Sequence, residues 1–151
     1  MKNGYTLTEI LVVIAVTGII LLFVINSFLN LIKIQALDSD YVSVASLIDQ
    51  AKSLSINSKS GYKYGVYFAT STVILFKGEA YSASTTDQVY NLNGRVNISD
   101  INLVGGGLNQ ITFDRLNGYA SASGTIGFSL KDGSAVPKII QIYNTGVVEY
   151  K

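Results

Sequence analysis

The spacing of hydrophobic and polar positions changes twice along the chain and marks three segments. From Leu7 to Ile25 nearly every position is apolar, and Glu9 is the only charged residue. Such an unbroken run predicts a helix that is apolar on every side. Counted on to Leu29, it has about 23 residues, or roughly 34 Å of helix, which is enough to cross the hydrocarbon core of a membrane.

The second segment has helical spacing on one face only. Apolar side chains recur at steps of three and four residues, with acidic and polar residues between them. This pattern predicts that one helix runs from about Thr6 to Asn57 and docks its second half on a folded domain. The apolar stripe comprises Ile34, Leu37, Tyr41, Val44, Ile48 and Ala51, and the positions off the stripe include Asp38, Asp40, Gln50 and Ser53.

The third segment begins near Gly61, where apolar and polar residues start to alternate and turn residues recur every eight to twelve positions. These features are typical of a β domain built from hairpins. A loop at Thr70-Ser71 predicts a hairpin with Val66, Phe68, Val73 and Leu75 on one face. The expected fold class is therefore α+β, with a long amino-terminal hydrophobic helix packed, through its amphipathic half, on an antiparallel β-sheet domain.

Two further hairpins are predicted from three-residue loops. A loop from Leu92 to Gly94, with Gly94 left-handed, puts Tyr90, Val96 and Ile98 on the same side. The second, Asn144-Thr145-Gly146, pairs Ile142 with Val148 and Ile140 with Tyr150. Apolar residues alternate at Ile111 and Phe113, then at Ile126, Phe128 and Leu130, and Asp132-Gly133 begins a loop that holds Pro137.

Composition narrows the possible functions. The chain has 151 residues, a single-domain length, and its 11 Lys and Arg residues nearly cancel its 10 Asp and Glu residues. No strong charge field predicts a nucleic-acid partner. Cysteine and histidine are both absent, which excludes disulfides, thiol nucleophiles, His-dependent triads and His/Cys metal sites. We therefore assign no catalytic residue, metal or cofactor, and we expect a protein that is not an enzyme.

Glu9 is the most informative residue of the apolar run. An acid at the centre of a lipid-buried helix costs roughly 2.5 to 3.5 kcal/mol, so a cationic partner is expected. A free α-amino group would serve if the short leader were cut off. Two other interpretations are open. In the first, Glu9 lies in the first helical turn and its negative charge gains about 0.3 to 1 kcal/mol from the helix dipole. In the second, the apolar run is an ordinary secretory signal ending at Ile25-Asn26-Ser27. The acid and the bulky Ile argue against the secretory signal.

The residues Lys2-Asn3-Gly4-Tyr5-Thr6-Leu7-Thr8-Glu9, followed by the apolar run, resemble the class III signal of type IV pilins and pseudopilins. The resemblance implies that a prepilin peptidase cuts between Gly4 and Tyr5 and methylates Tyr5, and that Glu9 neutralises this new terminus or that of a neighbouring subunit. It also implies the pilin fold, with a leader at 1–4, a transmembrane and filament-core helix at 5–29, an amphipathic half at 30–57 and a β-rich domain at 58–151.

A second resemblance, to the GspH/FimT branch of minor pilins, covers the carboxyl-terminal region. It rests on Ile111-Thr112-Phe113, Gly118, Gly124-Thr125-Ile126, Ile140 to Ile142 and Gly146-Val147. The implied protein is a structural subunit of a type IV pilus or of a type II secretion-like pseudopilus. Its implied partners are other pilin subunits, the prepilin peptidase, an inner-membrane assembly platform and, before assembly, membrane lipid.

The resemblance and the leader's charge favour a single-pass protein of the inner membrane with a cytoplasmic amino terminus, which moves into a periplasmic or extracellular filament after assembly. Small residues favour close helix packing, so Gly18, next to Thr17, is a candidate assembly position.

Two alternatives remain open. One is a DNA-binding minor pilin of an uptake pilus, with Arg115, Lys131, Lys138 and Lys151 as contacts, although the near-neutral charge weighs against phosphate binding. The other is a monomeric membrane-anchored domain, which predicts an uncut leader.

Overall fold

The computed structural model describes residues 6–57 and 61–150, except for the side chain of Asn26. The chain forms two compact units, Met1–Gln35 and Ala36–Lys151, and one helix runs through both. The elements are α1 (Leu7–Ile56), β1 (Tyr64–Phe68), β2 (Thr72–Lys77), the 3₁₀ turn η2 (Ala83–Thr85), β3 (Thr86–Asn91), β4 (Val96–Gly105), β5 (Gln110–Phe113), β6 (Ala122–Leu130), β7 (Lys138–Ile142) and β8 (Val148–Tyr150).

Helix α1 agrees with the predicted span within one residue at each end. It contains no proline and a single glycine, Gly18, so nothing in its interior removes a backbone hydrogen bond. The helix ends with the amide of Asn57 bonded to the carbonyl of Ser53 at 3.0 Å. The boundary between the two units falls at Gln35, six residues beyond the predicted end of the membrane-spanning half.

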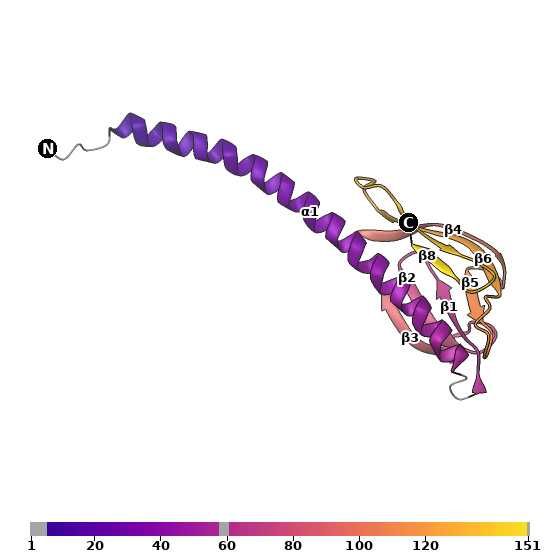
Figure 1. Cartoon of the computed structure of the whole chain (residues 1–151). Helices are drawn as coiled ribbons and strands as arrows, with labels where there is room; N and C mark the ends of the chain where they lie inside the picture. The colour runs from indigo at the N-terminus through magenta and orange to yellow at the C-terminus, as the bar shows by residue number, and fades with distance from the viewer. Residues whose placement is uncertain (1–5, 58–60, 151) are drawn as a thin grey trace. The chain divides into compact units, whose positions relative to one another are not determined.

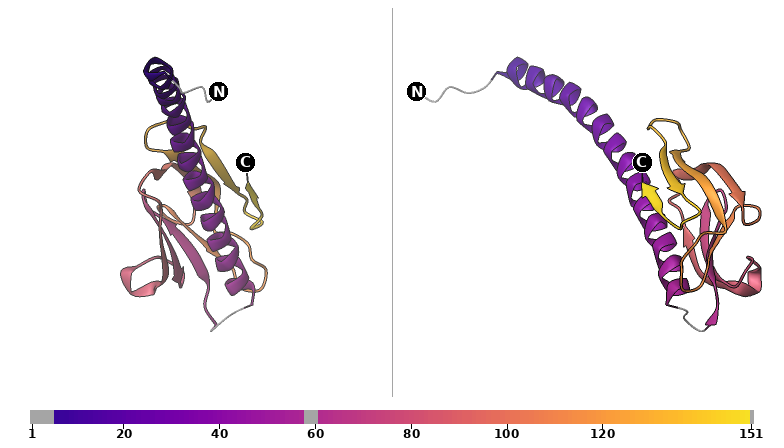
Figure 2. Two further views of the ribbon diagram at one scale, coloured as in Figure 1. Left: turned by 90° about the vertical axis from the view of Figure 1, so that its left-hand side faces the viewer. Right: turned by 45° about the vertical axis from the view of Figure 1, so that its right-hand side comes forward.

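The β domain consists of two four-stranded antiparallel sheets. Their strand orders are β3-β2-β1-β5 and β4-β6-β7-β8. In the second unit, Ala36–Lys151, the part of α1 from Ala36 onward lies against the strands, as Figures 1 and 2 show. The α+β fold with a long amino-terminal helix and antiparallel sheets is thus confirmed.

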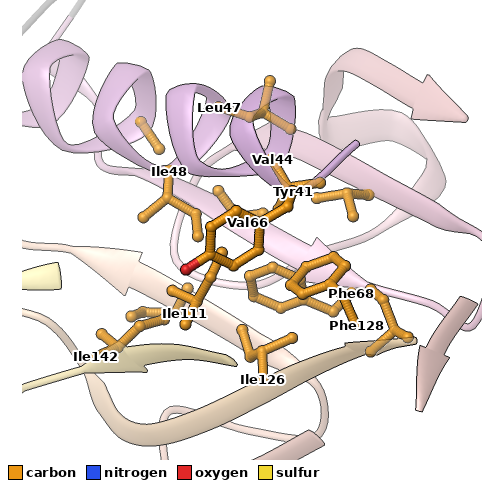
Figure 3. Close-up of a cluster of buried hydrophobic side chains, with 14 of the residues drawn as sticks. Tyr41, Val44, Leu47, Ile48, Val66, Phe68, Ile111, Ile126, Phe128 and Ile142 are labelled. Atoms are coloured by element: carbon orange, nitrogen blue, oxygen red, sulfur yellow. The ribbon is translucent and has the colours of Figure 1, made fainter. Parts of the chain in front are cut away.

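The core lies between the second half of α1 and both sheets. Figure 3 shows Tyr41, Val44 and Ile48 of the helix among side chains from several strands. The predicted stripe is buried from Leu37 to Ala51, whereas Ile34, which precedes this unit, is 44% exposed. Each fully buried aliphatic or aromatic side chain contributes about 1.5 to 3 kcal/mol, so this stripe fixes the helix on the sheets. The strand side chains labelled in the close-up are Val66, Phe68, Ile111, Ile126, Phe128 and Ile142.

Two of the three predicted hairpins are confirmed in register. Phe68 pairs with Val73 and Val66 with Leu75, which leaves Thr70-Ser71 as the loop. At the other end of the chain, Ile142 pairs with Val148 and Ile140 with Tyr150. The amide of Tyr143 bonds to the carbonyl of Val147 at 2.9 Å and so closes the three-residue loop.

The predicted hairpin around Leu92–Gly94 is wrong. Strand β3, which contains Tyr90, pairs with β2, whereas β4, which contains Val96 and Ile98, pairs with β6 in the other sheet. Gly94 is not left-handed; the turn is closed by the Val96 amide and the Asn93 carbonyl at 2.9 Å. The segment is a crossover between sheets: β4 pairs with β6 at nine positions, more than the six residues of β3 could supply.

Candidate membrane-anchoring and assembly site

Helix α1 begins with a side-chain cap. The hydroxyl of Thr6 accepts a hydrogen bond from the amide of Glu9 at 3.3 Å, and the amide of Ile10 donates to the Thr6 carbonyl at 3.3 Å. Thr6 therefore occupies the N-cap position and Glu9 the third helical position, the spacing of a capping box. Glu9 lies in the first turn, where a negative charge is favoured by the helix dipole. Gly4 and Tyr5, the predicted cleavage site, lie outside the described residues.

The surface around Glu9 is apolar and open. Ile10, Val13 and Ile14 line a shallow groove with the carboxylate, and each of them is more than half exposed. None of the most hydrophobic 18-residue stretch of α1 is buried against other described residues. The helix is long and apolar enough to span a membrane. Apolar surface of this extent marks contact with lipid or with other proteins.

Thr17 and Gly18 have different local roles. The Thr17 hydroxyl donates a 2.7 Å hydrogen bond to the carbonyl of Val13, so its polarity is satisfied within the helix. A Cβ at Gly18 would meet no atom within 4 Å. Gly18 therefore leaves an unfilled notch in an otherwise bulky apolar surface, which is the geometry that close helix packing uses.

The candidate basic residues do not gather in one place. Arg115 lies in the turn between β5 and β6, while Lys131 follows the far end of β6, a nine-residue strand roughly 30 Å long. Lys131 donates to the carbonyl of Gly94 at 2.8 Å. Lys138 pairs with Asp38 of α1 at 2.7 Å and lies over the ring of Tyr41. Lys151 lies outside the described residues.

One buried acid, Asp40, is not predicted from the sequence. Asp40 was assigned to the polar side of the helix, yet it is 5% exposed and accepts two hydrogen bonds, from Tyr90 and from the amide of Asn93. Asp40 lies three residues after Leu37 and four before Val44, so it is adjacent to the buried stripe on the helix surface. This spacing was the feature of the sequence that could have predicted its burial. This carboxylate holds the crossover between the two sheets against the helix.

Comparisons with known proteins agree with these features. A family model described as the prokaryotic N-terminal methylation motif matches residues 1–25. The crystal structure of the type IV minor pilin FimU from Pseudomonas aeruginosa (strain PAO1) is similar, with a TM-score of 0.56 and 9% sequence identity, and the match covers 76% of this chain and 91% of that chain. At this identity the likeness shows the fold. No curated protein matches the sequence.

The chain is thus an α+β protein with the fold of a type IV minor pilin. At its amino terminus, residues 1–25 match the prokaryotic N-terminal methylation motif.

Proposed function

We propose that this chain is a structural, non-enzymatic subunit, of the minor kind, of a type IV pilus or a type II secretion-like pseudopilus. The observation that carries the proposal is an acid in the first turn of a helix whose apolar surface is unburied, joined to a domain with a minor-pilin fold. Such a helix has two stable environments, lipid and a bundle of similar helices.

In this proposal a prepilin peptidase cleaves between Gly4 and Tyr5 and methylates Tyr5. The new amino terminus then lies only a few residues from Glu9. A buried charge without a partner costs several kcal/mol, so a subunit whose Glu9 meets a neighbour's terminus is favoured over one that does not. Gly18 would allow the neighbouring helix to approach closely.

Before assembly, the subunit would be held in the inner membrane with its amino terminus in the cytoplasm, and an assembly platform would move it into the filament. Mass spectrometry of the mature protein tests the processing step, with a chain that begins at methylated Tyr5 as the expected result. Recovery of the chain in sheared filament fractions tests the assembly step. A native product that retains Met1 and stays in the membrane would instead support the monomeric anchored domain.

DNA binding by an uptake pilus is the alternative function. It gains little support from the candidate cations, because Lys138 is paired with Asp38 and Arg115 lies far from Lys131. An electrophoretic shift assay with the full chain at low and high salt tests it. A shift that weakens with salt, and weakens further in Arg115→Ala and Lys131→Ala, would support phosphate contacts.

A further inference from the structure

The tripeptide Leu-Asn-Gly occurs twice in the β domain, at 92–94 and at 116–118. In an Asn-Gly dipeptide the asparagine side chain is easily attacked by the main chain, because glycine has no Cβ to shield the next backbone nitrogen. Attack of this nitrogen on Cγ of the asparagine closes a five-membered succinimide ring. The two copies have the same reacting atoms and the same preceding residue, so a difference in their reactivity comes from the fold.

The side chains of Asn93 and Asn117 are held in the same way. Each side-chain oxygen accepts a hydrogen bond from the amide two residues later, that of Arg95 in one turn and that of Tyr119 in the other, and both bonds are 3.1 Å long. A donor at Oδ1 draws electron density from Cγ, which makes this carbon a better target for a nucleophile. Both asparagines are exposed. The electrophilic carbons of the two turns are thus in equivalent settings.

The two glycines differ in the hydrogen bonding of their backbone nitrogen. The amide of Gly118 donates to the carbonyl of Asp114 at 3.1 Å, and this glycine is buried. The amide of Gly94 makes no hydrogen bond with any residue that the structure describes, and Gly94 is exposed. The nitrogen must lose its proton in order to attack, and a proton held by a carbonyl at a buried site exchanges slowly with solvent. Of the two nitrogens, that of Gly94 is therefore the one free to react.

Two neighbours favour the deprotonated form of the Gly94 nitrogen. The negative charge of a deprotonated peptide group is shared with its carbonyl oxygen, here that of Asn93, which accepts a hydrogen bond from the Val96 amide at 2.9 Å. The ammonium of Lys131 donates to the carbonyl of Gly94 at 2.8 Å, so a positive charge lies close to the reacting nitrogen of the same residue. Both contacts lower the cost of forming the nucleophile.

We propose that Asn93 is a site of spontaneous self-modification, because the fold directs deamidation to this asparagine and away from Asn117. The Gly94 nitrogen forms a bond to Cγ of Asn93, the bond from Cγ to the side-chain nitrogen breaks, and ammonia leaves with the proton that the backbone nitrogen has lost. One water molecule then opens the succinimide. Cleavage of the ring at Cγ gives aspartate, and cleavage at the main-chain carbonyl carbon gives isoaspartate, in which the main chain runs through Cγ.

The modification changes the connection between the two sheets. The amide of Asn93 donates to Oδ2 of Asp40 at 2.7 Å. Either product adds a negative charge to the residue that Asp40 binds, and like charges repel each other. Isoaspartate also inserts a methylene into the main chain between the Asp40 contact and the Val96 contact, so the two contacts cannot both keep their geometry. The modified chain therefore holds the crossover less firmly against α1.

The test follows the full chain in lipid nanodiscs during incubation in mildly alkaline buffer. Trypsin releases each turn in its own peptide, Gly78–Arg95 and Leu116–Lys131, and mass spectrometry with fragmentation measures deamidation at Asn93 and Asn117. In the folded chain, deamidation at position 93 should be about tenfold or more faster than at position 117. In guanidinium, which unfolds the chain, the two rates should agree within about twofold. Isoaspartate should be among the products at position 93, because direct hydrolysis of the side chain gives aspartate alone.

Gly94→Ala is the matched variant. A Cβ at position 94 would meet no atom within 4 Å, and the φ angle of Gly94 is not left-handed, so the fold accepts alanine. The methyl group shields the nitrogen, and deamidation at Asn93 should slow about tenfold while that at Asn117 stays unchanged. After incubation, the unchanged chain should unfold at a lower temperature than before, whereas the Gly94→Ala chain should not.

The outcomes that would overturn the proposal are distinct. Equal rates at the two asparagines of the folded chain would show that the fold does not select the site. Absence of isoaspartate, or an unchanged rate in Gly94→Ala, would exclude the succinimide route. An unfolding temperature that incubation leaves unchanged, despite modification at Asn93, would overturn the effect on the crossover.

Discussion

The hydroxyl of Tyr90 donates a 2.8 Å hydrogen bond to Oδ1 of Asp40, and this contact ties strand β3 to helix α1. The other carboxylate oxygen accepts a 2.7 Å bond from the amide of Asn93, in the crossover that leads to the second sheet. One acid therefore holds the helix, the edge of one sheet and the start of the connection to the other. Its two partners lie 50 and 53 residues away in sequence, so the contact stabilises the tertiary structure.

We expect Asp40→Ala to lower the free energy of unfolding by about 1 to 3 kcal/mol, because a partly buried hydroxyl and a partly buried amide both lose their acceptor. Chemical denaturation of the membrane-reconstituted chain, followed by circular dichroism, measures the loss. Asp87→Ala, at an exposed position of β3, is the control and should change stability by less than about 0.5 kcal/mol. Equal stability of the two variants would contradict the anchoring role of Asp40.

The second prediction concerns alkaline pH. Burial raises the pKa of the Tyr150 phenol, and its hydrogen bond to Asp49, 2.9 Å long, raises it further. A raised pKa in the folded state means that the protonated phenol stabilises the fold fully below the ordinary value of 10.0 and that this contribution is lost as pH rises above it. The pKa of Tyr90 is raised too, first by burial, so both groups act in the same direction.

Stability should therefore fall more steeply above about pH 10 than it does near neutrality. Tyr150→Phe should reduce this alkaline loss, which denaturation curves at about pH 7 and about pH 11 would measure. Thr86→Val, which changes an exposed, non-titrating side chain of β3, should leave the alkaline loss unchanged. An alkaline loss that is the same with and without the Tyr150 hydroxyl would show that this phenol does not contribute.

The sequence predicts structural features that depend on neighbouring residues, but it does not predict contacts between residues that are far apart in the chain. Helix α1 and the hairpin loops at 70–71 and 144–146 follow from local spacing and turn chemistry, because each loop sets the register of its own strands. The choice of sheet for β4 depends on β6, which comes about 25 residues later, so the Asn-Gly turn signal suggested the wrong partner.

The same limit applies to the sites. Glu9 could be singled out because an acid in an apolar run is visible in the sequence itself. The two partners of Asp40 depend on how the strands are placed, which alternation alone does not specify. Lys138 was a candidate nucleic-acid contact because no nearby residue in the sequence indicates its ion pair with Asp38, which lies 100 residues earlier.

A third prediction uses two left-handed glycines. Gly146 and Gly133 have φ angles of 73° and 68°, but a Cβ at Gly146 would collide with the carbonyl of Gly118, whereas a Cβ at Gly133 would meet nothing within 4 Å. Gly133→Ala should lower the free energy of unfolding by about 1 kcal/mol, through backbone strain alone. Gly146→Ala adds the collision with the Gly118 carbonyl and should lower the free energy of unfolding by about 3 kcal/mol or more. Thermal unfolding of both variants measures the difference, and equal losses would mean that the terminal hairpin relaxes freely.

The last prediction addresses assembly. Glu9→Ala removes an acid from an apolar helix, so membrane anchoring should not weaken, since any cost of placing that acid in lipid, at most about 2.5 to 3.5 kcal/mol at a helix centre, disappears. Incorporation into filaments should fall about tenfold or more, because the variant lacks the charge that attracts a neighbour's amino terminus. Glu9→Gln should behave like the alanine variant, since it keeps the shape and loses the charge. Immunoblots of membrane and sheared filament fractions measure both quantities.

Thr17→Val is the matched control for the Glu9 variants, because it removes a polar group from the same helix without changing its charge. The Thr17 hydroxyl bonds to the carbonyl of Val13 within the helix, so a neighbouring subunit does not need it, and incorporation should remain normal. If Glu9→Ala entered filaments as well as Thr17→Val does, the charge at position 9 would have no part in assembly. The apolar surface of α1 would then be sufficient to recruit the subunit.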